Sequence, residues 1–493
     1  MARLSLATVD LVTPAAQPPI DPRAVTTGIV HLGIGAFHRA HQGTFTQAAI
    51  AASGDLAWGI CGVTQRSANV LEQLAPQDGL YSVLQRGEDV SVSVLATARE
   101  VLFAKTQATE LVGRIAMPNT RVVSMTVSEK GYRHDSSTGR LRADDPEIMA
   151  DAAGAPPRTV VGQLVRGMQS RQRADAGPLT VVCCDNLHDN GRTLRQLVAD
   201  FCDLLPAAES SPLQAWIESS VKFPNTMVDR IVPATTDLDR AEAARLLGVD
   251  DFGVVVAEPF MQWVIEDEFA GPRPAWDAAG AILTDDVAPY EAMKLRLLNG
   301  SHSAIAYLGA LAGFDHVADV IRLDEVNSYV RALMDVDVTP TLDVPRDFDL
   351  PRYKDELLER FANRGLHYRT LQIAMDGSQK LPYRLLGTVA DRRAAAGTPH
   401  HALLAVAAWM RFVSADADEA GRPIRVDDPL AATLARQVKD ARGAAQLVDS
   451  LLALREVFGP ELRDDAAVRA TLIGYVDALA TKGVLQTLRE LSR

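Results

Sequence analysis

The first half of the chain has the hydrophobic pattern of an α/β sheet. A helix-like segment at 43–53 stands between two apolar runs. In residues 80–96 apolar and polar positions alternate more strictly, which favours antiparallel strands added to the parallel sheet. Residues 134–160, rich in Asp, Pro, Ser and Gly, are typical of a long surface excursion. The two apolar runs are 28–35 and 56–64, and two further candidate strands, 121–127 and 179–186, are near-continuous β-branched runs, as expected when helices cover both faces of a parallel sheet.

The pattern changes near Pro289, where segments of helical spacing begin to follow one another, separated by Pro, Gly or Asp. Such a series predicts helices that pack together. The clearest are 400–415, 444–459 and 466–483. We therefore expect an α/β Rossmann-type N-terminal domain over residues 1–288 and a mostly α-helical C-terminal domain over residues 289–493.

The composition disfavours several classes of protein. The 493 residues include 50 Lys and Arg against 63 Asp and Glu, a formal net charge of -13 that repels nucleic acid and anionic membranes. We therefore expect no nucleic-acid partner and no membrane association. We expect a cytoplasmic location, because no stretch has about 18 consecutive apolar residues. The four cysteines and ten histidines show no metal-binding spacing, so we expect buried free thiols and no metal site.

The segment IVHLGIGAFHRAHQ at 29–42 has the pattern of a buried strand that runs into a glycine turn. Gly33 and Gly35 suit the tight bend and the close approach of a pyrophosphate. The third glycine of the dinucleotide motif is absent. Three basic side chains follow, at His38, Arg39 and His41. They favour an anionic ligand beside a helix N-terminus, and the alternative is that they pair with acids at a domain interface.

The end of the second predicted strand carries no carboxylate. NAD-binding domains commonly place an acid there for the ribose hydroxyls, whereas a 2′-phosphate favours arginine or small donors. This chain has Gln65, Arg66, Ser67 and Asn69 instead. The choice between NAD and NADP therefore stays open at this point.

The segment EAMKLRLLNGSH places Lys294, Asn299 and His302 on one predicted helix. At about 100° per residue, Asn299 and His302 are neighbours, and a lysine side chain can span the two turns to His302. Apolar neighbours disfavour an ammonium, so Lys294 could act as a base. An amide can donate to a developing alkoxide. The alternative is a helix whose lysine and histidine reach solvent or a partner.

Two further loops carry polar residues in unusual places. CCDNLHDNG at 183–191 follows a strand end, where open α/β sheets bind ligands, and it offers Asn186 and Asn190. FPNTMVDRIVP at 223–233 holds Asp229 and Arg230 between apolar residues. These charges are either functional or paired inside the protein.

With these motifs in view, nearly the whole chain resembles the long-chain polyol-specific dehydrogenases, also called the mannitol dehydrogenase family. Seven blocks occur in the order of that family. They are IVHLGIGAFHRAHQ, SEKGY, CDNLHDNG, FPNTMVDRIVP, EPFMQWVIED, KLRLLNGSHSAIAYLG and MDGSQKLP. The resemblance implies a Rossmann-type domain, a helical domain and metal-independent hydride transfer in the cleft between them.

The resemblance also implies roles for single residues. Lys294 matches the general base, Asn190 and Asn299 the oxyanion hole, and His302 the residue that positions the substrate. Glu291 matches a proton conduit, and Asp229 and Lys380 match substrate-binding residues. We expect the cofactor to be NAD, with NADP left open. Its expected contacts are Gly33, Gly35, Phe37, His38, Arg39 and Arg66.

The substrate is expected to be a small polyol or its 2-ketose, with D-mannitol and D-fructose as the leading pair. Gln372 stands where some mannitol enzymes have a substrate-binding arginine. A hexuronate would favour a basic clamp, for which Arg369, Lys380 and Arg384 are candidates. The alternatives are therefore fructuronate reductase (D-mannonate oxidoreductase) and arabinitol dehydrogenase activities. A redox-inert nucleotide sensor is a remote alternative, and we expect a monomer or weak oligomer.

Overall fold

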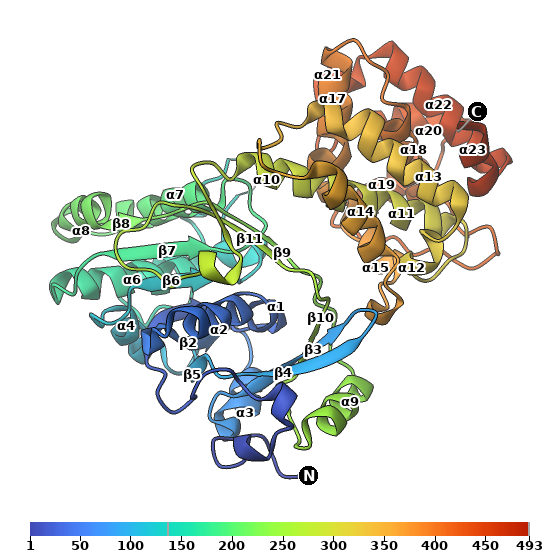
Figure 1. Cartoon of the computed structure of the whole chain (residues 1–493). Coiled ribbons are helices and arrows are strands. Elements are labelled where there is room, and N and C mark those ends of the chain that lie inside the picture. Colours follow the sequence, from blue (N-terminus) through green and yellow to red (C-terminus); the bar gives the residue numbers. More distant parts are fainter. Residues whose placement is uncertain (136–137, 492–493) are drawn as a thin grey trace. The chain divides into compact units, whose positions relative to one another are not determined.

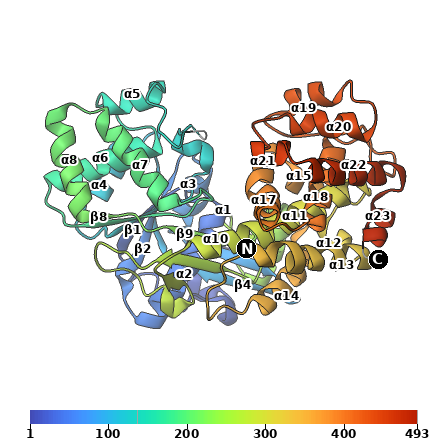
Figure 2. The same cartoon turned by 90° about the horizontal axis from the view of Figure 1, so that it is seen from above.

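The computed structural model describes residues 1–135 and 138–491 of the chain. It forms two compact units, Met1–Ala288 and Pro289–Arg493. Figures 1 and 2 show the first unit in blue to green and the second in yellow to red. Among the described residues, no helix has both the length and the apolar character needed to cross a membrane.

The first unit is built around a six-stranded parallel sheet in the order β5-β2-β1-β6-β7-β8. The parallel sheet expected from the apolar runs is confirmed, and the four predicted runs become β1, β2, β6 and β7. The bounds are β1 Thr27–Leu32, β2 Gly59–Thr64, β5 Ala98–Phe103, β6 Val122–Met125, β7 Leu179–Cys183 and β8 Val221–Lys222.

Both faces of this sheet are covered, which explains why most positions of its strands are apolar. Successive side chains of a strand point to opposite faces. Val30 and Leu32 pack in one cluster with residues of α4, α6 and α7, whereas Ile29 packs in another with Phe45 and Ile50 of α2. These helices are α2 Gln42–Ser53, α4 Ala108–Ile115, α6 Val160–Arg173 and α7 Asn190–Asp203.

Two smaller sheets complete the first unit. In one, β3 and β4 form the antiparallel pair predicted at 80–96, and β10 lies parallel to β3. In the other, β11 pairs with β9 and β12. The bounds are β3 Tyr81–Arg86, β4 Val90–Leu95, β9 Thr226–Asp229, β10 Val255–Ala257, β11 Gln262–Glu266 and β12 Ile282–Thr284.

The segment 134–160 is more ordered than a surface excursion. Its described part contains α5, at Pro146–Ala152, and two of its residues, 136 and 137, lie outside the described residues. Asp145 caps this helix by accepting from the Glu147 amide. The remaining helices of the first unit are α1 Ala36–Ala40, α3 Asn69–Leu74, α8 Ala207–Ser220 and α9 Asp237–Leu247.

The second unit is built from helices, as expected, and α10 begins at its boundary. The predicted helices at 400–415 and 466–483 are α18 and α22, whereas the one expected at 444–459 ends earlier, as α20. The bounds are α10 Ala288–Met293, α11 Gly300–Leu311, α12 Val317–Val320, α13 Asp324–Ala332, α14 Leu350–Phe361, α15 Thr370–Ala374, α16 Gly377–Leu381, α17 Gly387–Ala394, α18 His400–Ser414, α19 Ala431–Val438, α20 Gly443–Leu452, α21 Pro460–Arg463, α22 Ala466–Thr481 and α23 Val484–Leu491.

Helical segments of π type interrupt this regular pattern at Lys294–Asn299, Leu333–Val338 and Pro382–Leu386. The first joins α10 to α11, and at its end the Gly300 amide donates to the Leu295 carbonyl five residues earlier. The prediction of one regular α-helix through this segment is therefore wrong in its spacing. Since a π turn holds more residues than an α turn, the angles calculated at 100° per residue do not apply here.

Candidate active site

The two glycines of the turn after β1, Gly33 and Gly35, have different roles. Gly33 has φ +104°, and a Cβ there would lie 2.1 Å from the Thr126 carbonyl oxygen. Its amide and that of Ile34 donate to the Val63 carbonyl at 2.8 and 3.1 Å. Around a Cβ on Gly35, by contrast, the nearest atom is 3.8 Å away. Gly33 is thus required by the fold, and Gly35 leaves the open space that a pyrophosphate needs.

The basic side chains after this turn lie inside the unit. His38 stacks on His31 with ring centroids 3.4 Å apart, and burial lowers the pKa of His38 well below its ordinary value. Burial therefore favours the neutral form of His38, and its expected contact with the cofactor stays a prediction. The buried Arg39 guanidinium donates to the carbonyls of Gly35 and Gly253. Phe37 is half-buried.

A hydrogen-bonded chain beneath the turn holds Gly33 in place. The Thr126 hydroxyl donates to the Gly33 carbonyl at 2.9 Å, so its oxygen accepts from His31 Nε2, also at 2.9 Å. His31 Nδ1 then accepts from the Ser124 hydroxyl at 2.8 Å. Burial lowers the pKa of His31 to about 3, so the ring stays neutral with its proton on Nε2.

Asp185, just after β7, links the CDNLHDNG block to the SEKGY block through hydrogen bonds. Its carboxylate accepts from the amides of Val127 and Ser128 at 2.8 and 2.9 Å, and from the Tyr132 hydroxyl at 2.6 Å. Burial raises the pKa of Asp185, although these three donors favour its charged form. The loop after β6 is therefore fixed at the carboxyl edge of the sheet, where open α/β sheets bind ligands.

Asn190 lies at the same edge and is fully engaged in this structure. Its Oδ1 accepts from the Thr226 amide at 2.9 Å, and its Nδ2 donates to the carbonyls of Thr226 and Asp185 at 2.9 and 3.1 Å. To donate to a substrate oxygen, Asn190 has to give up one of these bonds. Asn186, from the same loop, is exposed.

The charges of the FPNTMVDRIVP block are both buried. Arg230 donates twice to the Glu258 carbonyl, at 3.0 and 2.8 Å, and once to the Ala40 carbonyl. Burial lowers the pKa of Arg230 to about 10, which leaves it charged at neutral pH. Asp229, at the end of β9, faces Gln262 of β11 in the strand register.

Some residues of this edge were missed by the sequence reasoning. Asn225 caps the start of α7 by accepting from the amides of Gly191 and Arg192 at 2.9 and 3.2 Å. Thr226 is the partner of Asn190. Asn and Thr next to an apolar strand commonly hydrogen-bond to backbone groups, so these residue types could have indicated such a role. Their partners could not be found from the local sequence, because they come from a segment more than 30 positions away.

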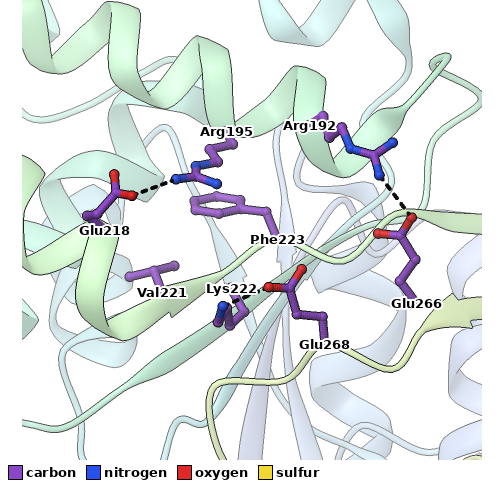
Figure 3. A pocket seen from close by; sticks show the side chains of 8 residues that line it. All are labelled: Arg192, Arg195, Glu218, Val221, Lys222, Phe223, Glu266 and Glu268. Carbon is purple, nitrogen blue, oxygen red and sulfur yellow. Dashed lines mark hydrogen bonds and ion pairs between the residues drawn. The ribbon is translucent and has the colours of Figure 1, made fainter. Parts of the chain in front are cut away.

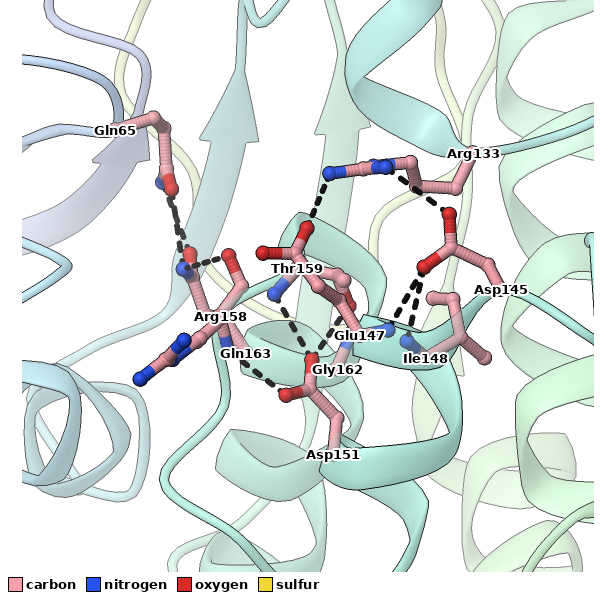
Figure 4. A network of polar contacts seen from close by, with 10 residues as sticks. All are labelled: Gln65, Arg133, Asp145, Glu147, Ile148, Asp151, Arg158, Thr159, Gly162 and Gln163. Carbon is pink, nitrogen blue, oxygen red and sulfur yellow. Dashed lines mark hydrogen bonds and ion pairs between the residues drawn. The ribbon is translucent and has the colours of Figure 1, made fainter.

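Arg66 is exposed in the loop after β2, as a cofactor contact at that strand end requires. Gln65, before it, forms a reciprocal amide pair with Gln163 of α6, with N···O distances of 2.9 and 3.0 Å (Figure 4). The Thr64 hydroxyl donates to the Ser67 carbonyl at 2.6 Å. These bonds fix the path of the loop and leave the Arg66 side chain in solvent.

The second unit carries Lys294, Asn299 and His302 on one continuous helix. Lys294 is 7 % exposed at the start of the π segment, and Asn299 is half-buried at its end. The amide of Asn299 has no hydrogen-bond partner among the described residues. His302 packs against the rings of Phe361 and Tyr368, with centroids 5.2 and 5.6 Å away. The helix thus presents a shielded amine and an available amide donor.

Arg384 and Gly300 are in contact at the distorted part of this helix. Arg384 donates to the Ser303 hydroxyl at 3.1 Å and to the Asn299 carbonyl at 3.5 Å. A Cβ on Gly300 would lie 2.7 Å from the Arg384 carbonyl oxygen, so the two segments meet only because residue 300 is glycine. The Arg384 guanidinium is thereby anchored to the helix that carries Lys294.

The other predicted substrate residues of the second unit have different environments. Lys380 is half-buried and donates to the carbonyls of Met375 and Ile373 at 2.6 and 3.4 Å. Arg369 and Gln372 are exposed at the start of α15. Glu291 is half-buried in α10, one turn before Lys294. The structure therefore makes Arg369 and Gln372 the accessible members of this set.

A charged pocket beside the edge strand β8 contains none of the predicted site residues (Figure 3). Its basic side chains face acids across three ion pairs. These are Arg195–Glu218 at 3.3 Å, Lys222–Glu268 at 2.7 Å and Arg192–Glu266 at 3.6 Å. Because each charge is already balanced, this pocket offers no strong attraction for an ionic ligand.

The cysteines are free and buried, as predicted. In the part of the chain that the structure describes, no three His, Cys, Asp or Glu side chains gather in an arrangement that could hold a metal ion.

Comparison with known proteins gives one consistent result. The model of the mannitol dehydrogenase Rossmann domain matches residues 27–278, and that of the mannitol dehydrogenase C-terminal domain matches residues 286–480. The chain is 41% identical to the uncharacterized oxidoreductase YeiQ of Escherichia coli over 94% of each chain. It is 40% identical to the D-mannonate oxidoreductase of Escherichia coli over 98% of this chain and 99% of the relative. The solved ternary complex of Pseudomonas fluorescens mannitol 2-dehydrogenase with NAD and D-mannitol is 36% identical, with a TM-score of 0.87 over 99% of each chain.

Proposed function

This chain belongs to the mannitol dehydrogenase family, and from that premise we propose that it is a metal-independent NAD(P)-dependent dehydrogenase. Its proposed reaction interconverts a sugar alcohol and the 2-ketose, with D-mannitol and D-fructose as the leading pair. The observation that carries the proposal is the helix with Lys294 shielded from water and Asn299 free to donate. An amine base and an amide donor are the two groups that oxidation of a secondary alcohol needs.

The first unit suits a dinucleotide cofactor. The cradle is the turn in which a Cβ on Gly33 would collide with the Thr126 carbonyl, whereas Gly35 is open. When bound, the nicotinamide ring supplies the acceptor for the hydride that leaves the substrate carbon. We assign the pyrophosphate to the backbone at Gly33 and Gly35, and the ribose end to the loop that carries Arg66.

The proton of the reaction goes to Lys294. In oxidation, its neutral amine takes the hydroxyl proton as the carbon–hydrogen bond breaks and the carbonyl forms. In reduction, the ammonium returns that proton to the new alkoxide. Removal from water favours the neutral form of an amine, and Lys294 is 7 % exposed. Glu291, one turn earlier, is proposed to carry the proton onward to solvent.

Asn299 and His302 are proposed to hold the reacting oxygen. The Asn299 amide donates to the oxygen as negative charge develops. His302, steadied by Phe361 and Tyr368, positions the hydroxyl group. Asn190 joins as a second donor by exchanging one of its carbonyl bonds for the substrate, and Asp229 and Lys380 bind the remaining hydroxyls.

The test of this mechanism is Lys294→Ala. Loss of the base should lower kcat by about 100-fold or more while NADH binding is retained. Lys354→Ala is the matched control, because it removes another buried lysine of the second unit, one that pairs with Asp335. Its kcat should change by less than about twofold. Near-normal turnover by Lys294→Ala would contradict the mechanism.

A second candidate reaction, reduction of fructuronate, is favoured by the 40% identity to a D-mannonate oxidoreductase. The exposed Arg369 is a suitable partner for its carboxylate. The deciding measurement is kcat/KM for D-fructose and for D-fructuronate with the same cofactor. A preference for fructuronate that is lost in Arg369→Gln would replace the mannitol proposal.

The sensor alternative is tested by the same assays. Tight NADH binding without turnover of any polyol, ketose or uronate would favour it. The expectations of a cytoplasmic location and of a monomer or weak oligomer stay predictions.

A further inference from the structure

Ser128, in the loop after β6, has a backbone conformation that glycine alone adopts readily. Its φ is +68° and its ψ is 155°. Arg133 and Asp189 also have positive φ, but with ψ of 35° and 51° they lie in the ordinary left-handed region. A conformation such as that of Ser128 persists only where the surrounding structure holds it, and such residues cluster at functional sites. The loop therefore needs contacts that offset its strain.

The Asp185 carboxylate makes such contacts. Its Oδ1 accepts from the Ser128 amide at 2.9 Å, and its Oδ2 accepts from the Val127 amide at 2.8 Å. Oδ2 also accepts from the Tyr132 hydroxyl at 2.6 Å. Because two successive amides point at one carboxylate, the chain cannot relax at Ser128 without losing at least one charge-assisted bond.

The segment held by Asp185 leads directly to the glycine turn. The hydroxyl of Thr126, which precedes Val127, donates to the Gly33 carbonyl at 2.9 Å. A Cβ on Gly33 would lie 2.1 Å from the Thr126 carbonyl oxygen, so the two backbones lie in close contact. A shift of Val127 would therefore move the segment against which the turn packs. The path of contacts runs from Asp185 through Thr126 to the turn that we assign to the pyrophosphate.

The main chain of Asp185 contacts a different part of the proposed site. Its carbonyl accepts from Asn190 Nδ2 at 3.1 Å, and Asn190 is a proposed donor to the reacting oxygen. A substitution of the Asp185 side chain leaves this carbonyl in place. The carboxylate can therefore be altered on the cofactor side while the contact with Asn190 is kept.

We propose that Asp185 is a positioning residue of this dehydrogenase, whose carboxylate holds the strained loop at Ser128 against the glycine turn. The turn is thereby formed before the cofactor arrives, and a site formed in advance binds more tightly because less ordering accompanies binding. The inference rests on the proposed function, since it concerns the turn that would bind the dinucleotide. It adds a residue that acts through Thr126 and Gly33.

The experiment measures the Kd of NADH with the full chain, and the KM of NADH and of whichever of D-fructose and D-fructuronate is reduced. Asp185→Asn keeps the size of the side chain, but its NH2 group faces a backbone amide donor in either orientation. The Kd and KM of NADH should rise by about tenfold or more, whereas the sugar KM and kcat at saturating NADH should stay within about threefold. A merely structural role would lower kcat through loss of folded protein and leave both KM values unchanged.

Asp151→Asn is the matched control, because Asp151 makes the same set of bonds elsewhere in the first unit (Figure 4). Its carboxylate accepts from the amides of Arg158 and Thr159 at 2.9 and 2.8 Å, and from the Thr159 hydroxyl at 2.6 Å. Asp151 is fully buried, so this variant should lose at least as much stability in urea as Asp185→Asn. Its Kd for NADH should stay within about twofold of the parent value. An equal loss of NADH affinity in both variants would overturn the proposal, because affinity would then follow stability.

Ser128→Gly tests the strain while the carboxylate is kept. Glycine adopts this conformation readily, so the variant should unfold at a higher urea concentration than the parent, with the Kd of NADH within about twofold. Combined with Asp185→Asn, it should recover about threefold or more of the lost affinity, because the loop then needs less support. No recovery would overturn the proposal. A urea midpoint of Ser128→Gly no higher than that of the parent would overturn it as well, and this result decides if Asp185→Asn does not fold.

The remaining outcomes distinguish this inference from the proposed function. If the parent protein binds NADH and Asp185→Asn binds it within about twofold as tightly, Asp185 is not a positioning residue and the dehydrogenase proposal stands. If the parent protein binds neither NADH nor NADPH, the proposed function itself fails.

Discussion

The basic side chains that follow the neighbouring strands β1 and β2 differ in burial. After β1, His38 and Arg39 are buried, and Arg39 donates to carbonyls of its own unit. After β2, Arg66 is exposed. A cation binds an anionic ligand only if its charge is accessible. The more conspicuous basic cluster of the sequence is therefore the less suitable one.

The difference arises from packing. The short helix α1 follows the turn directly, and its residues His38 to Ala40 face the interior. Its second basic residue, Arg39, is buried, and its guanidinium donates to the backbone carbonyls of Gly35 and Gly253. The loop after β2 has no such enclosure, because Thr64 and Gln65 hold only its beginning. Exposure, and not the number of basic residues, separates the two strand ends.

The largest expected effect comes from the glycines of the β1 turn. Gly33→Ala should lower the free energy of unfolding by about 3 kcal/mol, because φ is +104° and the new Cβ would meet the Thr126 carbonyl. Gly35→Ala, with open space around it, should change stability by less than about 0.5 kcal/mol but weaken NADH binding about tenfold or more. Urea unfolding and NADH titration measure the two quantities. Equal losses of stability would contradict the separation of roles.

A smaller effect on stability is expected when Arg39 and Arg66 are replaced in turn. Arg39→Met should cost about 2 kcal/mol of stability, because the Gly35 and Gly253 carbonyls lose their donor. Arg66→Met should cost less than about 0.5 kcal/mol, as expected of an exposed side chain without partners among the described residues. Thermal unfolding of both variants, with NADH titration alongside, gives the comparison. A loss of NADH affinity in a stable Arg39→Met protein and none in Arg66→Met would contradict the assignment of the ribose end of the cofactor to the Arg66 loop.

The strands of the main sheet could be predicted because each carries its own signal. Val122 to Met125 and Leu179 to Cys183 are apolar without interruption, and no tertiary contact is needed to recognise a covered strand. The glycine turn was predictable for the same reason. In the second unit, Lys294 and Asn299 could be placed on a helix from apolar spacing alone.

The remaining features depend on contacts between distant positions. The π segment at Lys294–Asn299 accompanies the close approach of Gly300 and Arg384, which are 84 positions apart. The bonds of Asn190 go to Thr226, and the link from Gln65 to Arg158 passes through Gln163. Helical periodicity and local composition contain no information on such pairs. For this reason the accessible cation of the β2 end could be predicted only in part.

A third expected effect is a pH dependence that arises from the histidine stack under the β1 turn. His31 has a pKa of about 3 in the folded protein, against 6.5 as the ordinary value. Above pH 6.5 both states are neutral, and below it only the unfolded state gains the proton. Stability should therefore fall as pH decreases from 6.5 towards 3, by about 2 kcal/mol from His31 at pH 5.

His38 should contribute a loss in the same direction, because burial also lowers its pKa. His38→Phe keeps a ring against His31 and removes one titrating group. Urea unfolding at pH 7 and pH 5 should show a smaller acid loss for this variant than for the parent protein. If the two lose the same stability, His38 carries a proton in the folded state. The β1 end would then present a cation after all, and the contrast with β2 would disappear.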